Sequence, residues 1–276
     1  MPPKIAVIQF PGSNCEYETA RAVRSVGLDC DIVRWNISSE QFLSYSGYIL
    51  PGGFSFQDRI RAGVIASKLP IIDLVIQADQ QNKPVLGICN GCQILAEAGL
   101  IPNFDESHTI QVALAPNTIQ DEPCGFICDW KYVKMAKPEQ NIFTKLFSEN
   151  DVLPIPINHG EGRFVLSGEI EKILNEFMVI RYCDANGEIS SNYPVNPNGS
   201  FSNIAGLSNR RGNVLAIMPH PERATFLKQV PTWINSIWAE KKLGASQADI
   251  QTAGPWKKFF QSLAEHLVNK KQAVVA

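Results

Sequence analysis

The sequence predicts an α/β fold with three layers: a doubly wound, mostly parallel sheet that carries added antiparallel strands. Two observations support this prediction. Short apolar runs alternate with helix-length segments over roughly the first 90 residues, which is typical of βαβ units in a sheet covered on both faces. From about residue 109 onwards, extended segments are separated by turn residues instead, and this pattern favours antiparallel strands joined to the same sheet.

The elements of the parallel half can be assigned in chain order. Apolar runs predict the strands, and stretches with helical spacing of apolar residues follow them. The expected strands are 4–10, 30–35, 47–53 and 83–89, and the expected helices are 15–26, 38–43 and 60–81. Ligands of such sheets bind at the carboxyl ends of the strands, which is where the sequences PGG and ICNG fall.

The second half of the chain is expected to be richer in antiparallel strands. Its extended segments are 109–115, 125–135, 152–166 and 178–184, with a helix candidate at 168–177 and a hairpin turned at 209–212. No linker or repeat interrupts the chain, so residues 1–276 are predicted to form a single domain. Residues 227–255 read as an insert, a helix and a loop, before a last amphipathic helix at about 256–270.

Composition narrows the class of protein. The formal net charge of −2 argues against a nucleic-acid or anionic-membrane partner held by bulk electrostatics. No apolar run reaches the length of a membrane span, and no signal peptide is visible. Seven cysteines form an odd, scattered set rather than a disulfide framework, so reduced thiols in a cytoplasmic protein are expected.

A cysteine at the end of the fourth strand is the strongest candidate for a reactive group. Gly87-Ile88-Cys89-Asn90-Gly91 has the pattern Gly-x-nucleophile-x-Gly, and a helix is expected to begin at its end. In such a nucleophile elbow, the flanking glycines avoid collisions within a tight, strained turn. The amino end of the helix places partial positive charge near the sulfur and favours its thiolate.

Other interpretations of Cys89 remain open. A cysteine after an apolar strand is usually a core residue, although glycines on both sides argue against that here. Cys92 completes a C-x-x-C pair, so a thioredoxin-like redox function is the main rival. That motif usually carries Gly-Pro between its cysteines, and Cys92 is therefore expected to pack one helical turn further along. Cys124 and Cys128 have no matching ligand pair, so no metal site is expected.

An oxyanion hole needs two backbone donors. The N–H of Asn90 follows the nucleophile directly and can point at the carbonyl oxygen under attack. Gly52 and Gly53 end the preceding strand, and they allow the backbone to approach a ligand closely. Gly53 is the expected second donor.

A cysteine nucleophile also needs a base and a group that orients the base. His220 directly follows an apolar run, and Pro221 favours an extended backbone there. Residues two apart in an extended segment face the same way, so Glu222 is expected to orient His220. Of the other histidines, His159 lies in a glycine-rich NHGEG segment that suggests backbone exposed to a ligand. The remaining two, His108 and His266, are expected at the surface.

With these residues assembled, the chain closely resembles the class I glutamine amidotransferases, which have a flavodoxin-like fold. Within them it is similar to the glutaminase subunits that serve formylglycinamidine ribonucleotide synthesis in purine biosynthesis. The resemblance covers residues 4 to about 226 and weakens beyond. Its motifs are FPGSN (10–14), PGGFSFQDRIRAGVIA (51–66), GICNGCQIL (87–95), NHGEGRF (158–164), NYPVNPNGS (192–200) and MPHPER (218–223).

The resemblance implies a mechanism for these residues. Cys89 attacks the side-chain amide of glutamine. His220, held by Glu222, protonates the departing ammonia and later activates water against the γ-glutamyl thioester. Gly53 and Asn90 hold the oxyanion.

The resemblance also implies how the substrate and partners are bound. Gln93 contacts the α-substituents of glutamine, and Asn158, His159 and Gly160, with Gly52, hold the rest of the amino acid. Ammonia passes to a separate synthetase subunit, which uses ATP and Mg²⁺, and a small accessory subunit is expected as well. The chain itself is expected to hold no cofactor.

Three rival functions differ in class. A stress-response hydrolase or chaperone of the same elbow-cysteine fold lacks a His-Pro-Glu sequence late in the chain. A non-catalytic scaffolding subunit is opposed by the intact Cys89, His220 and Glu222, although sequence does not exclude it. A thiol–disulfide redox module would depend on Cys92, whose replacement tests it.

Overall fold

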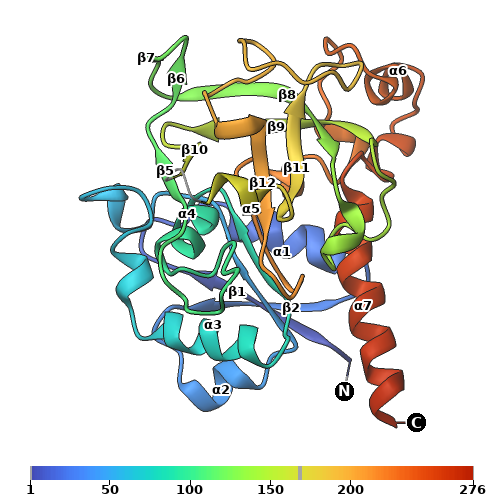
Figure 1. The fold of residues 1–276 in the computed structure, drawn as a ribbon. Coiled ribbons are helices and arrows are strands. Elements are labelled where there is room, and N and C mark those ends of the chain that lie inside the picture. Colours follow the sequence, from blue (N-terminus) through green and yellow to red (C-terminus); the bar gives the residue numbers. More distant parts are fainter. Residues whose placement is uncertain (1, 167–169, 276) are drawn as a thin grey trace.

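The structure of the protein is a computed structural model that describes residues 2–166 and 170–275. Its central sheet has nine strands in the order β2-β1-β3-β4-β13-β12-β11-β8-β9 (Figure 1). The first five strands of this order run parallel, and the remaining four are antiparallel to their neighbours. The predicted fold class is therefore confirmed, and the antiparallel strands extend the parallel sheet.

The strands agree closely with the apolar runs of the sequence. The parallel strands are β1 (Lys4–Gln9), β2 (Asp29–Arg34), β3 (Gly47–Leu50), β4 (Val85–Ile88) and β13 (Val214–Ile217). The antiparallel strands are β12 (Ile204–Ser208), β11 (Met178–Cys183), β8 (Ile127–Met135) and β9 (Val152–His159). Two small separate sheets pair β5 (Ala113–Ala115) with β10 (Arg163–Val165), and β6 (Thr118–Ile119) with β7 (Glu122–Pro123).

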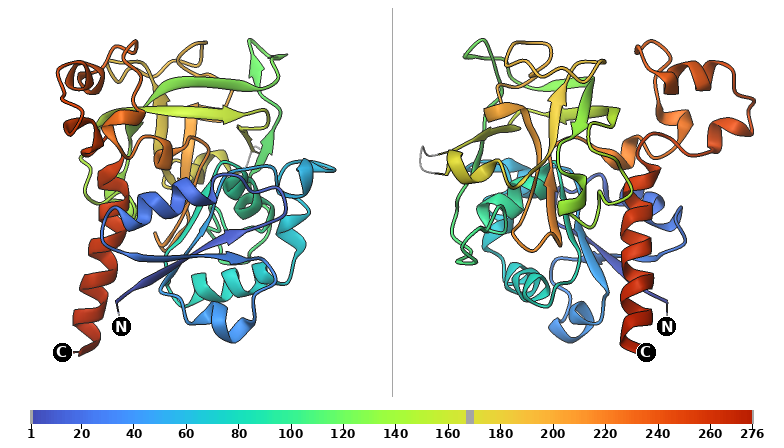
Figure 2. Two further views of the ribbon diagram at one scale, coloured as in Figure 1. Left: turned by 180° about the vertical axis from the view of Figure 1, so that it is seen from behind. Right: turned by 45° about the vertical axis from the view of Figure 1, so that its right-hand side comes forward.

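Helices cover the sheet on both sides. The helices are α1 (Glu16–Arg24), α2 (Ser39–Leu43), α3 (Ile71–Gln80), α4 (Asn90–Glu97), α5 (Glu171–Leu174), α6 (Ile237–Leu243) and α7 (Lys257–Val275). α1 and α7 lie on one face, and α2, α3 and α4 lie on the other (Figures 1 and 2). None of the helices in the described residues has the length and apolarity of a membrane span.

Two helix predictions need correction. The helix expected over 60–81 is interrupted: a short 3₁₀ turn, Ala66–Lys68, precedes α3, which begins after Pro70. Pro70 lacks the N–H that a continuing helix requires, and Gly63 has a positive φ of 80°. The helix expected over 168–177 reduces to the four residues of α5, and residues 168 and 169 lie outside the described part.

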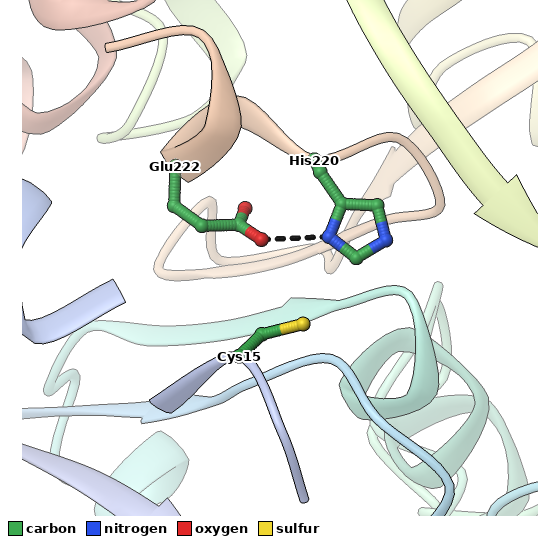
Figure 3. Close-up of side chains that lie close together, drawn as sticks. All are labelled: Cys15, His220 and Glu222. Carbon is green, nitrogen blue, oxygen red and sulfur yellow. Dashed lines mark hydrogen bonds and ion pairs between the residues drawn. The ribbon is translucent and has the colours of Figure 1, made fainter. Parts of the chain in front are cut away.

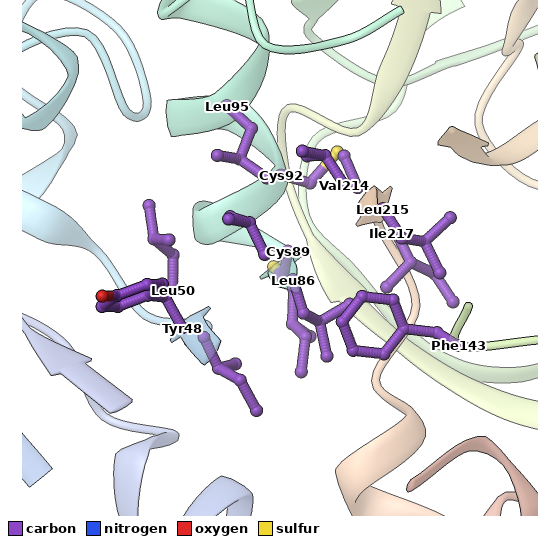
Figure 4. Packing of buried hydrophobic residues seen from close by; sticks show 14 of the residues in the cluster. Tyr48, Leu50, Leu86, Cys89, Cys92, Leu95, Phe143, Val214, Leu215 and Ile217 are labelled. Atoms are coloured by element: carbon purple, nitrogen blue, oxygen red, sulfur yellow. The ribbon is translucent and has the colours of Figure 1, made fainter. Parts of the chain in front are cut away.

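The core lies around the centre of the sheet. Leu86 of β4 and Leu215 and Ile217 of β13 are fully buried on one face of the sheet (Figure 4). Leu95 of α4 is fully buried on the opposite face, over Gly87 of β4. Burying each such side chain contributes about 1.5–3 kcal/mol. α4, and with it the cysteine at its start, is therefore held firmly on the sheet.

The segment before the last helix forms its own small cluster. Val230, Ile234 and Ala239 are buried against one another, and Trp130 and Trp238 pack around them. α6 is the helix that was predicted in this insert, and α7 is the predicted last helix.

Candidate active site

Cys89 lies at the turn between β4 and α4, with backbone angles φ 51° and ψ −105°. A positive φ is uncommon for a residue other than glycine and costs roughly 1–3 kcal/mol. Core packing of β4 and α4 offsets that cost and holds the strained turn in place. Strain of this kind is typical of a nucleophile elbow.

The two glycines around Cys89 are needed for space. A Cβ atom at Gly91 would lie 2.0 Å from the carbonyl oxygen of Leu50, on β3. A Cβ atom at Gly87 would lie 2.5 Å from the carbonyl oxygen of Gly91 and 2.6 Å from the side chain of Leu95. Both predicted glycine positions therefore permit α4 to pack directly on the strands.

His220 and Glu222 form a buried pair at the carboxyl end of β13. Nδ1 of His220 and Oε1 of Glu222 are 2.6 Å apart, and both side chains are almost wholly buried. Pro221 lies between them, at the start of the 3₁₀ turn Pro221–Arg223 (η5). The predicted orienting contact is present, and it leaves Nε2 of His220 without a hydrogen-bond partner among the described residues.

The charge of Glu222 controls the ionisation of His220. Burial alone would lower the pKa of the imidazole, but the carboxylate of Glu222 and the neighbouring thiols of Cys89 and Cys15 outweigh it. The pKa of His220 is consequently raised well above its ordinary value. An imidazole that readily takes a proton suits the partner of a thiol nucleophile.

A second thiol, which the sequence did not single out, lies beside this pair. Cys15 precedes α1, and its sulfur lies below the imidazole of His220 (Figure 3). A Cβ atom at Gly52 would lie 2.8 Å from Cε1 of His220 and 3.0 Å from Sγ of Cys15. Burial raises the pKa of the Cys15 thiol, so this thiol stays neutral near neutral pH.

Cys15, His220 and Glu222 have the donor types and spacing of a metal site, since one donor atom from each lies within 4.8 Å of the others. Arg223 argues against a dication there. Its Nη2 donates to Sγ of Cys15 at 3.2 Å, and its Nε lies 3.9 Å from Oε1 of Glu222. The guanidinium already balances the negative charge that would attract a cation.

The two predicted oxyanion donors lie at neighbouring strand ends. Gly53 has a φ of 147°, and a Cβ atom there would lie 2.7 Å from the backbone of Ser13. Within the described residues, the N–H groups of Gly53 and Asn90 donate no hydrogen bond. Both are therefore available to a ligand, as an oxyanion hole requires.

A cavity of about 120 Å³ opens beside the nucleophile. It brings together most of the predicted site residues: Gly53, Cys89, Gln93, Asn158, His159 and Gly160. The carbonyl oxygen of Asn158 accepts a hydrogen bond from Sγ of Cys89 at 3.6 Å. Gly52 does not line the cavity; its carbonyl oxygen accepts from the N–H of Cys15 at 3.2 Å. Its absent side chain instead makes room for His220.

Five further residues line the cavity and were not assigned a role from the sequence: Phe54, Asp58, Ala62, Phe126 and Glu161. The rings of Phe54 and Phe126 are half-exposed and stack with centroids 6.2 Å apart. Burial and the charge of Glu161 raise the pKa of Asp58 to about 6. The motifs PGGFSFQDR and HGEGR contain three of these residues, but their spacing carries no signal of a shared cavity.

Gln93 is part of a hydrogen-bond network in the cavity wall. Its Nε2 donates to the carbonyl oxygen of Glu161 at 2.6 Å, and its Oε1 accepts from Nδ2 of Asn90 at 2.9 Å. The network places the side chain of Gln93 at the cavity and fixes its orientation. Contact with a bound substrate would supplement or replace one of these bonds.

His159 is a buried neutral group. Burial and the neighbouring His220 lower its pKa to about 3, and Nδ1 lies 3.2 Å from Oδ1 of Asn117. Its carbonyl oxygen already accepts from Nδ2 of Asn117 at 2.7 Å. The expected exposed backbone is thus occupied by Asn117 at this residue.

Three other sequence predictions can be compared with the structure. Cys92 is completely buried, and burial raises the pKa of its thiol well above the ordinary value, as the packing interpretation expects. His108, expected at the surface, is only partly exposed, and its Nε2 lies 3.4 Å from the buried carboxylate of Asp79. His266 is only partly exposed on α7, and burial lowers its pKa.

Comparison with known proteins places this geometry in a family. The CobB/CobQ-like glutamine amidotransferase domain matches residues 2–267. Phosphoribosylformylglycinamidine synthase subunit PurQ of Methanothrix thermoacetophila is 41% identical over 276 residues, covering 97% of this chain and 99% of that protein. The PurQ subunit of Aquifex aeolicus is 41% identical over 225 residues, covering 80% of this chain and 91% of its own. The alignment with the Methanothrix relative therefore extends over the segment 227–255.

Solved structures agree with these sequence matches. A chain of PurLQS from Thermotoga maritima superposes with a TM-score of 0.71 at 30% identity, covering 97% of this chain and all of that chain. A glutamine amidotransferase of Thermotoga maritima, at 18% identity and a TM-score of 0.51, shares the fold. The strained Cys89, the buried His220–Glu222 pair and these matches lead to one conclusion: the chain belongs to the glutamine amidotransferase family.

Proposed function

We propose that this chain is the glutaminase subunit of a phosphoribosylformylglycinamidine synthase. It hydrolyses glutamine to glutamate and ammonia, and the ammonia serves de novo purine biosynthesis in the cytoplasm. The observation that carries the proposal is the Cys89 elbow beside the His220–Glu222 pair, in a chain 41% identical to a PurQ subunit along almost its whole length.

The proposed reaction has two halves, the formation of a thioester on Cys89 and its hydrolysis. Sγ of Cys89 attacks the side-chain carbonyl of glutamine, and the N–H groups of Gly53 and Asn90 stabilise the oxyanion. Nε2 of His220 accepts the thiol proton of Cys89 and passes it to the amide nitrogen, which leaves as ammonia. His220 then takes a proton from the water that attacks the thioester and returns it to the departing Sγ of Cys89, while Glu222 holds the imidazole at Nδ1.

The ammonia acceptor is expected on other chains. A large synthetase subunit would use ATP and Mg²⁺ to activate formylglycinamide ribonucleotide, and a small accessory subunit would complete the assembly. The similar Thermotoga maritima chain comes from a structure of PurLQS, which supports a partnership of this kind. The expectation that this chain binds no cofactor of its own remains part of the proposal.

Reconstitution with the synthetase from the same organism tests the function. Amidine product is measured with ATP, Mg²⁺ and formylglycinamide ribonucleotide, using either glutamine or ammonium, for wild type and Cys89→Ala. We expect glutamine to support synthesis only with wild type, and ammonium to support it with both. Use of glutamine by Cys89→Ala would refute the mechanism. No use of glutamine by wild type would refute the purine assignment.

The insert at 227–255 is proposed to cover part of the interface with the synthetase. Trp233 and Ile237 are largely exposed there. Gln229 must be kept in any truncation, because its Nε2 donates to the carbonyl oxygen of Glu222 at 3.0 Å. Residues 231–251 are therefore the segment to remove. Unchanged glutamine-dependent synthesis after this deletion would show that the insert is a surface elaboration without such a role.

A further inference from the structure

Arg223 follows Glu222 directly and has no part in the reaction proposed above. Its guanidinium lies between the start of α1 and the turn that carries the base. Nε donates to Oε1 of Glu18 at 2.5 Å, and Nη2 donates to Sγ of Cys15 at 3.2 Å. The same Nε lies 3.9 Å from Oε1 of Glu222, the oxygen that contacts His220. One side chain therefore joins α1 to the orienting carboxylate.

The loop before α1 also holds the strand end that carries the oxyanion donor. The N–H of Phe54 donates to the carbonyl oxygen of Gly12 at 2.9 Å, and the N–H of Cys15 donates to that of Gly52 at 3.2 Å. These bonds fix the backbone on both sides of Gly53. Residues 12–18 thus contact Gly52 and Phe54, on either side of Gly53, and also contact Arg223.

We propose that Arg223 is a positioning residue: held by Glu18, it fixes the carboxylate of Glu222 against His220 and links the base to the loop of the oxyanion donor. The contact spans 205 residues of sequence. The contact assigns a role to Glu18 and Arg223, neither of which lines the cavity. The proposal rests on the proposed function, since it assigns His220 as the base.

The charges around the base determine what Arg223 does to its ionisation. The groups that face His220 come from η5, the elbow, the loop before α1 and β9: Glu222, Cys89, Cys15 and His159. Arg223 in turn faces Cys15, Glu18 and Glu222. In this set Arg223 is the one side chain that is always cationic. Its charge favours the thiolate form of a neighbouring cysteine, as at Cys15, and the charge of Glu18 opposes that effect.

The rate of Cys89 alkylation measured against pH tests this inference on the isolated full chain. Iodoacetamide labelling followed by site-resolved mass spectrometry gives the pH midpoint of Cys89 apart from the other six cysteines. Arg223→Gln should raise the midpoint by about half a pH unit, and Glu18→Gln should lower it by a similar amount. Arg223→Lys keeps the charge, so its midpoint should stay near that of wild type.

Glutaminase kinetics in the complex with the synthetase provide the second readout. Arg223→Gln and Arg223→Lys should lower kcat about tenfold and leave KM within about twofold, because the carboxylate is misplaced while the substrate cavity is intact. Glu18→Gln should lower kcat as well, and the double variant should be no worse than Arg223→Gln alone. Arg210→Gln, at the opposite end of β13, is the matched control and should behave as wild type.

The possible outcomes separate the inference from its alternatives. For Arg223→Gln, loss of activity with an unchanged alkylation midpoint and a lowered melting temperature would mean a structural role only, and would overturn the proposal. Additive losses in the double variant would overturn the part played by Glu18. If Arg223→Gln does not fold, the alkylation midpoint of Glu18→Gln decides: a midpoint below that of wild type supports the proposal, and an unchanged or higher one overturns it. The two variants could shift the alkylation midpoint in opposite directions while the wild-type chain fails to use glutamine with the synthetase. That result would refute the proposed function and leave the positioning role intact.

Discussion

Gly52 lies directly against the imidazole of His220, so that a Cβ atom at position 52 would stand 2.8 Å from Cε1. The same atom would stand 3.0 Å from Sγ of Cys15 and 3.5 Å from Cβ of Cys89. Gly52, just after β3, therefore lies where the side chains of the nucleophile Cys89 and the base His220 approach each other. The absence of a side chain at Gly52 matters more for the position of His220 than for contact with the substrate.

Gly52→Ala should therefore impair catalysis by displacing His220. A displacement of about 1 Å at a catalytic group can cost roughly 100-fold in rate, and we expect a fall of that order in kcat/KM for glutamine hydrolysis. Gly244→Ala is the control, because the nearest atom to a Cβ there is 3.9 Å away. Activity of Gly52→Ala within twofold of wild type would mean that the imidazole does not depend on this space.

Cys92 provides a test between hydrolysis and redox chemistry. Its side chain is completely buried beside the core, so Cys92→Ala should cost about 1 kcal/mol of stability through a small cavity. Cys92→Ser should cost about 1–3 kcal/mol, since its hydroxyl would be buried without an assured partner. Both variants should still hydrolyse glutamine in the complex. Loss of hydrolysis at a temperature where both variants are folded would favour a role for the cysteine pair.

The strands were the part of the fold most readily predicted from sequence. The apolar runs at 4–10, 30–35 and 83–89 match β1, β2 and β4 within two residues. In β1 and β4 this is because strands buried on both faces leave a continuous apolar signal. The stretch 60–81 failed for a local reason. Its helical spacing is real, but Pro70 removes a backbone donor within it, and that restriction overrides periodicity.

The candidate site divides in the same way. The His220–Glu222 contact and the elbow glycines follow from short-range patterns, so the residues themselves indicated them. Cys15 follows the FPGSN motif and Arg223 ends the MPHPER motif, yet they lie 208 residues apart, and no local pattern records that they touch. Contacts of this type depend on the order of strands in the sheet, which single-sequence periodicity does not contain.

His159 should remain uncharged over the whole physiological pH range. Its pKa in the folded chain is about 3, against about 6.5 for an unfolded histidine. The unfolded chain therefore binds a proton first as the pH falls, and stability is lost between about pH 6.5 and about pH 3. At pH 5 the loss should be about 2 kcal/mol relative to pH 8.

Urea unfolding of wild type and His159→Gln at several pH values measures this effect. The difference in unfolding free energy between the two proteins should change by that amount between pH 8 and pH 5. An NMR titration of the His159 ring should show no protonation above about pH 4. A ring that titrates near pH 6.5 would contradict the buried neutral state.

Asp58 should destabilise the free chain at neutral pH. Burial and the charge of Glu161 raise the pKa of its carboxyl to about 6, from 3.8. The folded chain consequently holds the proton more tightly than the unfolded chain, and stability falls as the pH rises from about 4 to about 6. Asp58→Asn removes the charge and should be more stable than wild type above pH 6. The gain should be about 1 kcal/mol after allowance for the half-exposed side chain.

Thermal unfolding of Asp58→Asn and wild type across pH 4 to 8 tests this sign. The variant should melt about 2 °C higher at pH 7.5, and the difference should shrink toward pH 4, where both forms are neutral. Asp73→Asn is the matched control, because Asp73 is exposed on α3 and does not line the cavity. A variant that is less stable than wild type at pH 7.5 would mean that a favourable partner holds the Asp58 carboxylate. The hydrogen bond that Nδ2 of Asn90 donates to Oδ1 of Asp58, at 3.3 Å, would be the first candidate for that partner.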